Sequence, residues 1–109
     1  MRFDVITIFP QLIEQAIQYG ILGRAVESEL LQVVIHNLRD YCHDRHRQVD
    51  DTPYGGGPGM VMKPEPFFEA VRTLRDDGQG DGRVVLLSPQ GQSFNQQKAR
   101  QLGLHSRLI

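Results

Sequence analysis

The sequence has little of what marks several protein classes. It contains one cysteine, Cys42, which excludes an internal disulfide and fits a reducing compartment such as the cytoplasm. No apolar run approaches the roughly 20 residues of a membrane-spanning helix, so the sequence predicts no contact with a membrane. The first residues, MRFDVITIFPQL, carry Asp4 within their apolar stretch and lack a small-residue cleavage site. They therefore do not predict a signal peptide.

An excess of positive charge is also missing. Twelve Lys and Arg oppose 13 Asp and Glu, which gives a formal net charge of −1. A site for a polyanion must then be a local cluster and not a global basic field. The length of 109 residues fits one domain, and the apolar content is that of an ordinary globular chain.

Strand-like and helix-like segments alternate along the chain. This alternation predicts an α/β fold with a mainly parallel sheet flanked by helices. Strands are expected at residues 3–9, 30–38 and 84–87, with another beginning at 107–109. Helices are expected over residues 10–17, 21–26, 64–74 and 94–102. The third helix should bury the stripe from Phe67 to Leu74, and the last should open with a capping box of Ser93 and Gln96.

Residues 39–60 show no periodicity and are rich in His, Arg, Asp, Pro and Gly. A patternless stretch of about 20 residues is long for a structural connection and is more often functional or mobile. It ends in Tyr54-Gly55-Gly56-Gly57-Pro58-Gly59-Met60. Glycines permit positive φ and close approach of another molecule, and a flexible turn is the equally weighted alternative. Met60 stands where a phosphate-binding loop needs lysine, which disfavours a nucleotide-binding protein.

The upstream part of this stretch, His43-Asp44-Arg45-His46-Arg47, mixes charges of both signs. Arg45, His46 and Arg47 could contact phosphates, and Asp50 could accept hydrogen bonds from a base. The alternative is a solvated cluster with internal ion pairs. Cys42 with His43 and His46 matches structural zinc spacing poorly, so no metal site is predicted. Cys42 itself is expected to be inert because no paired base is evident.

Ser88-Pro89-Gln90-Gly91 follows the expected strand 84–87 and precedes a helix. Ligands gather at such strand ends in open α/β sheets. Proline stiffens the turn, and free backbone groups could recognise a flat heterocycle. An ordinary strand–helix turn is the alternative.

Four segments occur together in one order: MRFDVITIFP, YGILGRAV, RDYCHDRHRQVDDTPYGGGPGMVM and VVLLSPQGQ. In order and spacing they resemble the bacterial tRNA (guanine-N(1))-methyltransferases of the TrmD family, over the whole 109 residues. The resemblance implies a SPOUT (α/β-knot) fold, a homodimer and a cytoplasmic enzyme. It further implies methyl transfer from S-adenosylmethionine to N(1) of the tRNA guanosine 3′ of the anticodon, with Mg²⁺ a further candidate cofactor of the full-length enzyme.

The resemblance also assigns residues. The first cofactor loop would consist of Leu87, Ser88, Pro89, Gln90 and Gly91. Contacts to the target guanosine and adjacent RNA would come from His46, Asp50, Tyr54, Gly55, Gly57, Gly59 and Met60. Arg24 and Arg45 are further candidates for contacts to tRNA or to the partner subunit.

By the same resemblance, residues 1–109 are the N-terminal part of a SPOUT domain that stops before the knot closes. The general base, the remaining cofactor loops and the C-terminal tRNA-binding domain would lie beyond residue 109, so no catalytic residue is assigned here. The 109-residue chain alone is then expected not to methylate tRNA. The alternative function is a non-catalytic RNA-binding module that uses the His/Arg and glycine-rich loop.

Overall fold

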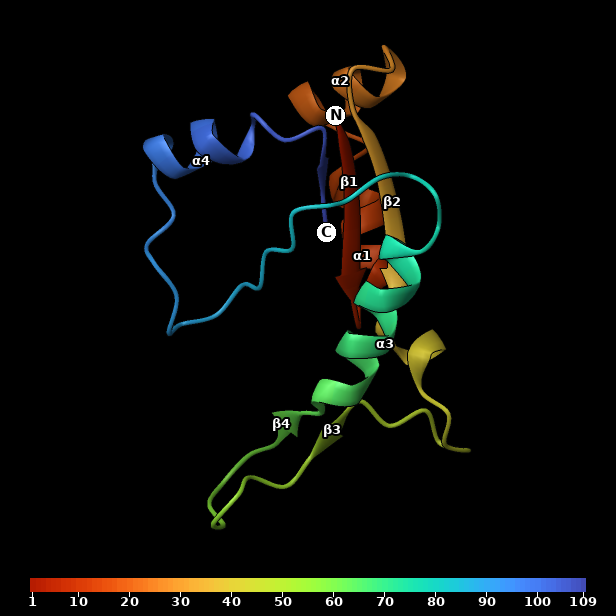
Figure 1. Cartoon of the computed structure of the whole chain (residues 1–109), viewed down its shortest axis with the longest axis vertical. Helices are drawn as coiled ribbons and strands as arrows, with labels where there is room; N and C mark the ends of the chain where they lie inside the picture. Colours follow the sequence, from red (N-terminus) through yellow and green to blue (C-terminus); the bar gives the residue numbers. More distant parts are fainter.

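A computed structural model describes all 109 residues, and its centre is a three-stranded parallel sheet (Figure 1). The strands are β1 (Arg2–Thr7), β2 (Gln32–Asn37) and β5 (Arg107–Leu108), in the order β2-β1-β5. β1 pairs with both neighbours in parallel, with Phe3 opposite Val33 and Leu108. The predicted α/β class with parallel pairing is therefore confirmed.

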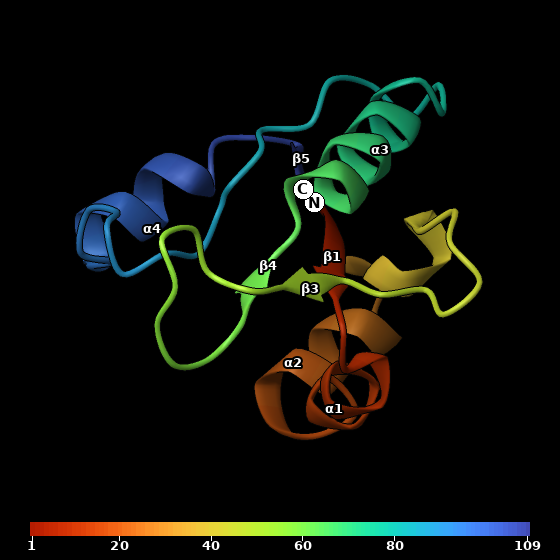
Figure 2. The same cartoon turned by 90° about the horizontal axis from the view of Figure 1, so that it is seen from below.

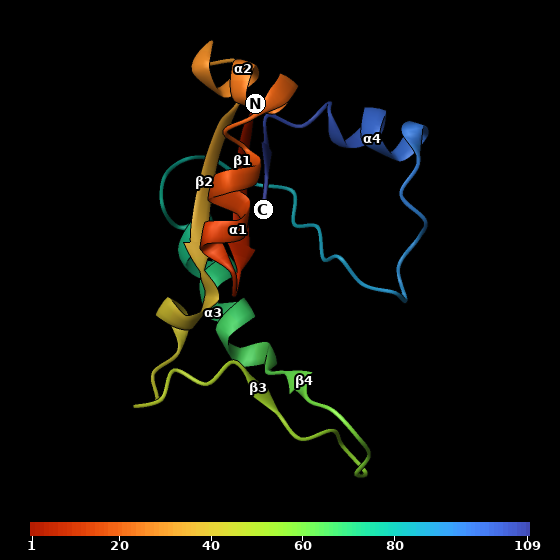
Figure 3. The same cartoon turned by 180° about the vertical axis from the view of Figure 1, so that it is seen from behind.

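Helices cover both faces of this sheet. The connection from β1 to β2 contains α1 (Pro10–Ala16) and α2 (Gly20–Glu27), and α1 begins with proline, whose missing N–H costs nothing in the first turn. On the opposite side lies α3 (Pro64–Arg75), which packs on the 3₁₀ turn η1 (Leu38–Tyr41) (Figure 2). The last helix, α4 (Gln96–Leu102), stands apart from the sheet (Figure 3).

The patternless segment contains more order than its sequence indicates. β3 (Asp50–Asp51) and β4 (Val61–Met62) form a two-stranded antiparallel hairpin in which Asp50 pairs with Met62. The strands have only two residues each, too few to show an alternating pattern. The hairpin projects from the lower end of the molecule and leads directly into α3 (Figure 1).

Two local predictions are wrong. Residues 84–87 form no strand. Arg83 makes a single β-bridge with Leu108, and beyond it only the N–H of Val85 donates to this edge, to the carbonyl of Ile109 (2.8 Å). The capping box of Ser93 and Gln96 does not form either. Asn95 is the N-cap of α4, and its side chain accepts from the N–H of Lys98 (2.9 Å).

The buried core is small, and its apolar members are Leu38, Val49, Ala70, Leu74 and Ile109. The Cα radius of gyration is 15.6 Å, against about 13 Å for a compact chain of this length. The predicted stripe of α3 is only partly buried, because Phe68 lies on the outer face and is 68% exposed. No helix combines the length and the apolar character needed to cross a membrane.

Candidate functional site

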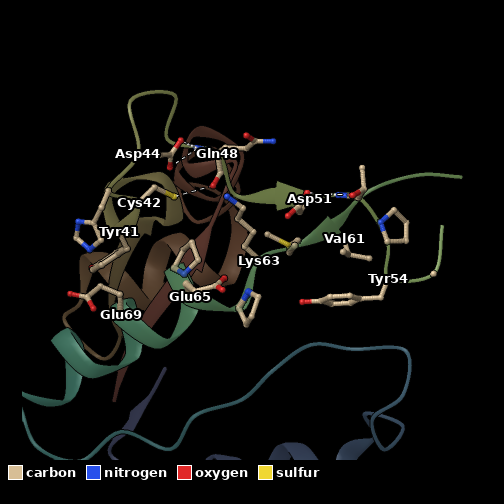
Figure 4. Close-up of a pocket in the computed structure, with 17 residues that line it drawn as sticks. Tyr41, Cys42, Asp44, Gln48, Asp51, Tyr54, Val61, Lys63, Glu65 and Glu69 are labelled. Atoms are coloured by element: carbon tan, nitrogen blue, oxygen red, sulfur yellow. Dashed lines mark hydrogen bonds between the residues drawn. The ribbon is translucent and has the colours of Figure 1, made fainter. Parts of the chain in front are cut away.

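A cleft of about 620 Å³ lies between the hairpin, the segment that follows η1 and the first turn of α3 (Figure 4). Tyr54 stands at its open edge and is 98% exposed. Four carboxylates and one lysine line it, so the cleft is acidic. These charged residues are Asp44, Asp51, Lys63, Glu65 and Glu69. Carboxylates can accept hydrogen bonds from the N–H groups of a base, but they repel phosphates.

The glycine-rich tip of the hairpin has the backbone that its sequence predicts. Gly55 has a φ of 79° and Gly57 a φ of 137°, both in the region that favours glycine. No atom lies within 4 Å of a Cβ built at either position. The tip therefore presents exposed backbone to solvent, together with Gly59 and Met60. Of the predicted RNA-binding residues, Tyr54 and Gly55 line the cleft, whereas Gly57, Gly59 and Met60 do not.

The charged cluster upstream divides into engaged and free side chains. Arg47 donates to Asp40 and to the carbonyl of Arg39, and Asp44 accepts from the N–H of Gln48. This part agrees with the alternative of internal pairing. Arg45 and His46 are exposed and make no side-chain hydrogen bond, and the Asp50 carboxylate accepts none. These three side chains, and that of His43, which is also exposed without a side-chain hydrogen bond, are available for a partner.

Cys42 is engaged in the fold. Its thiol contacts the carbonyl oxygens of Gln48 (3.5 Å) and Leu38 (3.9 Å). Burial, with a smaller effect from the charge of Asp44, raises the pKa of the thiol above its ordinary value. A thiol with a raised pKa is a poor nucleophile, which supports the prediction of an inert cysteine. No three His, Cys, Asp or Glu side chains are arranged to hold a metal ion.

The predicted cofactor loop is a tight exposed turn. The N–H of Gly91 donates to the carbonyl of Ser88 (3.1 Å), and the N–H of Gln90 donates to the Ser88 hydroxyl (3.2 Å). The backbone N–H groups of Leu87 and Ser88 have no partner, and the Leu87 side chain is 90% exposed. Free backbone donors beside an apolar side chain suit a flat heterocycle.

The structure does not gather all of the assigned residues. Arg24 lies on α2 at one end of a molecule whose longest extent is 46 Å, and the hairpin lies at the other end (Figure 1). The turn at Leu87–Gly91 belongs to an extended segment that runs from the sheet out to α4 (Figure 3). Arg24, the hairpin and the turn are thus three separate surfaces of this chain.

Known proteins resemble the chain over its full length. Residues 1–109 match the family described as tRNA (Guanine-1)-methyltransferase TrmD. The chain belongs to this family. Proteins named tRNA (guanine-N(1)-)-methyltransferase are 50% identical to it in Dehalococcoides mccartyi strain BAV1 and 48% identical in Dictyoglomus turgidum, each over the whole chain.

A solved structure shares the fold. The crystal structure of the tRNA (m1G37) methyltransferase from Aquifex aeolicus matches 99% of the chain with a TM-score of 0.88 and 38% sequence identity. The chain spans 48% of that protein, and 44% and 43% of the two relatives named above. This TrmD-family chain therefore corresponds to less than half of its relatives' length.

One charged cluster of this TrmD-family chain was not predicted from the sequence. The carboxylate of Asp4 is buried between the three strands and accepts from Arg2, His36 and Arg107 at 2.8–2.9 Å. An ionised carboxylate only accepts, so His36 donates through Nε2 and its Nδ1 faces the Tyr41 hydroxyl at 3.5 Å. The signal was present in the sequence, because Asp4 interrupts an otherwise apolar strand.

Hydrogen bonding keeps this buried carboxylate ionised. Burial is the largest single influence and opposes ionisation. The hydrogen bonds from Arg2, His36 and Arg107 together outweigh it and lower the pKa of Asp4 from 3.8 to about 2. Asp77, in the loop after α3, also has a lowered pKa, chiefly because Arg107 donates to it. The cluster joins all three strands and one loop.

Proposed function

We propose that this chain provides the N-terminal part of a tRNA methyltransferase that uses S-adenosylmethionine to methylate N(1) of the guanosine 3′ of the anticodon. The family match over all 109 residues carries the proposal. The presence of both a turn suited to a heterocycle and a glycine-rich hairpin supports it, because the reaction must hold both a cofactor and a base.

The turn at Leu87–Gly91 forms one wall of the proposed cofactor site. When bound, S-adenosylmethionine supplies an electrophilic methyl group. Leu87 and Pro89 offer apolar surface, and the free N–H groups of Leu87 and Ser88 can donate to ring nitrogens. The residues present thus fit the adenine end of the cofactor. The residues of this chain do not fit Mg²⁺, since no group of three His, Cys, Asp or Glu side chains is placed to hold a metal ion.

The hairpin and the loop before it form the proposed RNA side. Arg45 and His46 are free to contact phosphates, and the unpartnered Asp50 carboxylate can accept hydrogen bonds from a base. The exposed ring of Tyr54 offers a stacking surface. An extruded purine needs a close backbone, which the tip at Gly55–Gly59 provides. Arg24, on α2, would contact RNA or a partner subunit elsewhere.

The remaining expectations belong to the longer protein. They are a knotted SPOUT domain, a homodimer, tRNA as substrate and a cytoplasmic location. The relatives are more than twice as long as this chain. Large apolar side chains of the 84–95 segment and the α4 end are exposed, among them Leu86, Phe94 and Leu104. Their exposure supports further protein packing on this side.

A hybrid enzyme tests the proposal. Residues 1–109 replace the matching part of the Aquifex aeolicus methyltransferase, and steady-state kinetics are measured with S-adenosylmethionine and a tRNA transcript. We expect Pro89→Ala to raise the KM for S-adenosylmethionine about fivefold, because the turn loses its stiffening. Asp50→Ala should lower kcat about 100-fold and leave that KM unchanged, because the target base loses a hydrogen-bond acceptor that orients it. Asp76→Ala, at the exposed end of α3, is the control.

Two outcomes would contradict the assignments. If Pro89→Ala and Asp50→Ala both behave as Asp76→Ala does, neither surface serves the reaction. If the hybrid folds and binds tRNA without any dependence on S-adenosylmethionine, the chain is a non-catalytic RNA-binding module instead.

A further inference from the structure

The buried side chain of Arg107 joins the sheet to the loop after α3. It is 2% exposed and starts from β5, the edge strand. Nε donates to Asp4 (2.8 Å), Nη2 donates to Asp77 (2.8 Å), and Nη1 donates to Asp77 (3.0 Å) and to the carbonyl of Gly80 (2.7 Å). Four of the five N–H groups of a guanidinium are thereby used.

Charges in this cluster balance only when every member is present. Asp4 and Asp77 oppose Arg107 and Arg2, and Arg2 lies 3.7 Å from Asp77. The two nitrogens of Arg107 meet both carboxylate oxygens of Asp77, a geometry that lysine cannot reproduce. Asp4, which accepts from Nε, fixes the plane of the guanidinium that faces the loop.

The main chain of Arg107 and Ile109 holds the residues that follow the loop after α3. The N–H of Arg83 donates to the carbonyl of Arg107 (3.1 Å), and the N–H of Val85 donates to the carbonyl of Ile109 (2.8 Å). Gly82 packs closely there, since a Cβ on it would lie 2.5 Å from the Ile109 side chain. Beyond Val85 the chain makes no further backbone hydrogen bond to the sheet before the turn at Ser88.

Side chain and main chain of β5 thus fix the path by which the chain enters Leu87–Gly91. We propose that Arg107, oriented by Asp4 and bound to Asp77, is a positioning residue that sets the place of this turn for cofactor binding. The proposal rests on the assignment of Leu87–Gly91 to the cofactor under the proposed function. Fixing the entry to the turn matters because residues 86–95 themselves make no backbone hydrogen bond to the sheet.

Hydrogen exchange tests the positioning without any cofactor. Amide exchange of Arg83 and Val85 is measured by NMR in the 109-residue chain and in Asp77→Asn. The variant keeps the contact of Arg107 with Asp4 but removes the negative charge that Nη1 and Nη2 of Arg107 bind. We expect exchange at these two amides to accelerate about tenfold or more, while β1–β2 amides change less than about twofold. Asp81→Asn, an exposed acid of the same loop with no hydrogen bond, should change neither.

Arg107→Lys separates geometry from charge. Lysine keeps one positive charge but cannot donate from two nitrogens to both carboxylate oxygens of Asp77. The variant should therefore accelerate exchange at the same two amides as Asp77→Asn does. Unchanged exchange at Arg83 and Val85 in both variants would overturn the proposal. So would equal acceleration throughout β1 and β2, since Arg107 would then be a general stabiliser of the sheet.

Steady-state kinetics of the hybrid enzyme test whether the position of the turn matters for cofactor binding. Asp77→Asn should raise the KM for S-adenosylmethionine about tenfold and change kcat less than about threefold. If the amides accelerate as expected and this KM does not move, the loop is held but not for the cofactor, and the proposal fails. If the unmutated hybrid transfers no methyl group, the proposed function fails. The exchange result still decides whether Arg107 holds the loop.

Discussion

Among single residues, Asp4 shows how a charge can specify a fold from inside it. Its side chain is fully buried, yet three donors from three strands surround it. Burying an unpaired carboxylate is strongly unfavourable, so only the arrangement that brings Arg2, His36 and Arg107 together is compatible with an ionised Asp4. The cluster therefore selects this strand order over alternatives that apolar packing alone would allow.

Acid should weaken the fold through Asp4. Its pKa is about 2 in the folded chain and 3.8 ordinarily. The unfolded chain therefore binds more protons between these values. The contribution of Asp4 to the free energy of unfolding, about 2 kcal/mol, is present above pH 4 and is lost as pH falls towards 2. Asp77 acts in the same direction. Urea unfolding followed by circular dichroism at several pH values measures this loss.

The Asp4→Asn variant supplies the comparison. At neutral pH it should lose about 3–5 kcal/mol, because two arginines lose their buried partner. Its stability should then vary less with pH between 4 and 2. Asp40→Asn, which removes only the exposed pair with Arg47, should cost less than about 1 kcal/mol. Parallel pH profiles for Asp4→Asn and the unmutated chain would contradict the assigned pKa.

Among the secondary-structure elements, the first turn of α4 allows a specific prediction. α4 begins at Gln96 because Asn95 can satisfy a free N–H of the first turn, which Ser93 is too far upstream to do. We expect Asn95→Ala to destabilise α4 by about 1 kcal/mol and Ser93→Ala to have almost no effect. Amide exchange of Lys98 and Ala99 in the two variants distinguishes the caps. A larger effect from Ser93→Ala would show that the helix starts earlier.

Replacing Gly23 in α2 by alanine should lower the stability of the chain, although alanine usually stabilises a helix relative to glycine. A Cβ at this position would lie 2.5 Å from the backbone carbonyl oxygen of Gln18, which the turn between α1 and α2 fixes. Glycine to alanine normally stabilises a helix by up to about 1 kcal/mol. Here we expect Gly23→Ala to destabilise the chain by about 1–3 kcal/mol in thermal or urea unfolding. Glu27→Ala, exposed on the same helix, should be neutral, and a stabilising Gly23→Ala would exclude this close approach.

Sequence patterns predicted the elements that carry their own periodicity and missed those that depend on distant partners. β1, β2 and α3 follow from their apolar spacing and proline positions. Residues 84–87 have the composition of a strand, but a strand also requires a neighbour, and only Arg83 and Val85 find one. The same limit applies to the site. Tyr54 and Gly55 stand out by composition, whereas the partners of Arg107 are set by tertiary contacts across β1 and the loop after α3.

The whole molecule is open, with few buried residues and a radius of gyration above that of a compact chain. The hairpin, the turn at Leu87–Gly91 and α2 are separate surfaces around one small sheet (Figure 1). The proposed reaction transfers a methyl group from a cofactor to a large RNA and so needs binding surfaces for both. The shape is consistent with a chain that contributes several such surfaces and depends on additional protein to bring them together.

Formation of N(1)-methylguanosine by the hybrid enzyme is the decisive measurement for the proposed methyl transfer. A tRNA transcript is incubated with S-adenosylmethionine and the hybrid, then digested and analysed by mass spectrometry. We expect N(1)-methylguanosine at the position 3′ of the anticodon from the hybrid, and none from the 109-residue chain alone. If a folded hybrid leaves this guanosine unmodified under conditions where the Aquifex aeolicus enzyme modifies it, the proposed function is wrong.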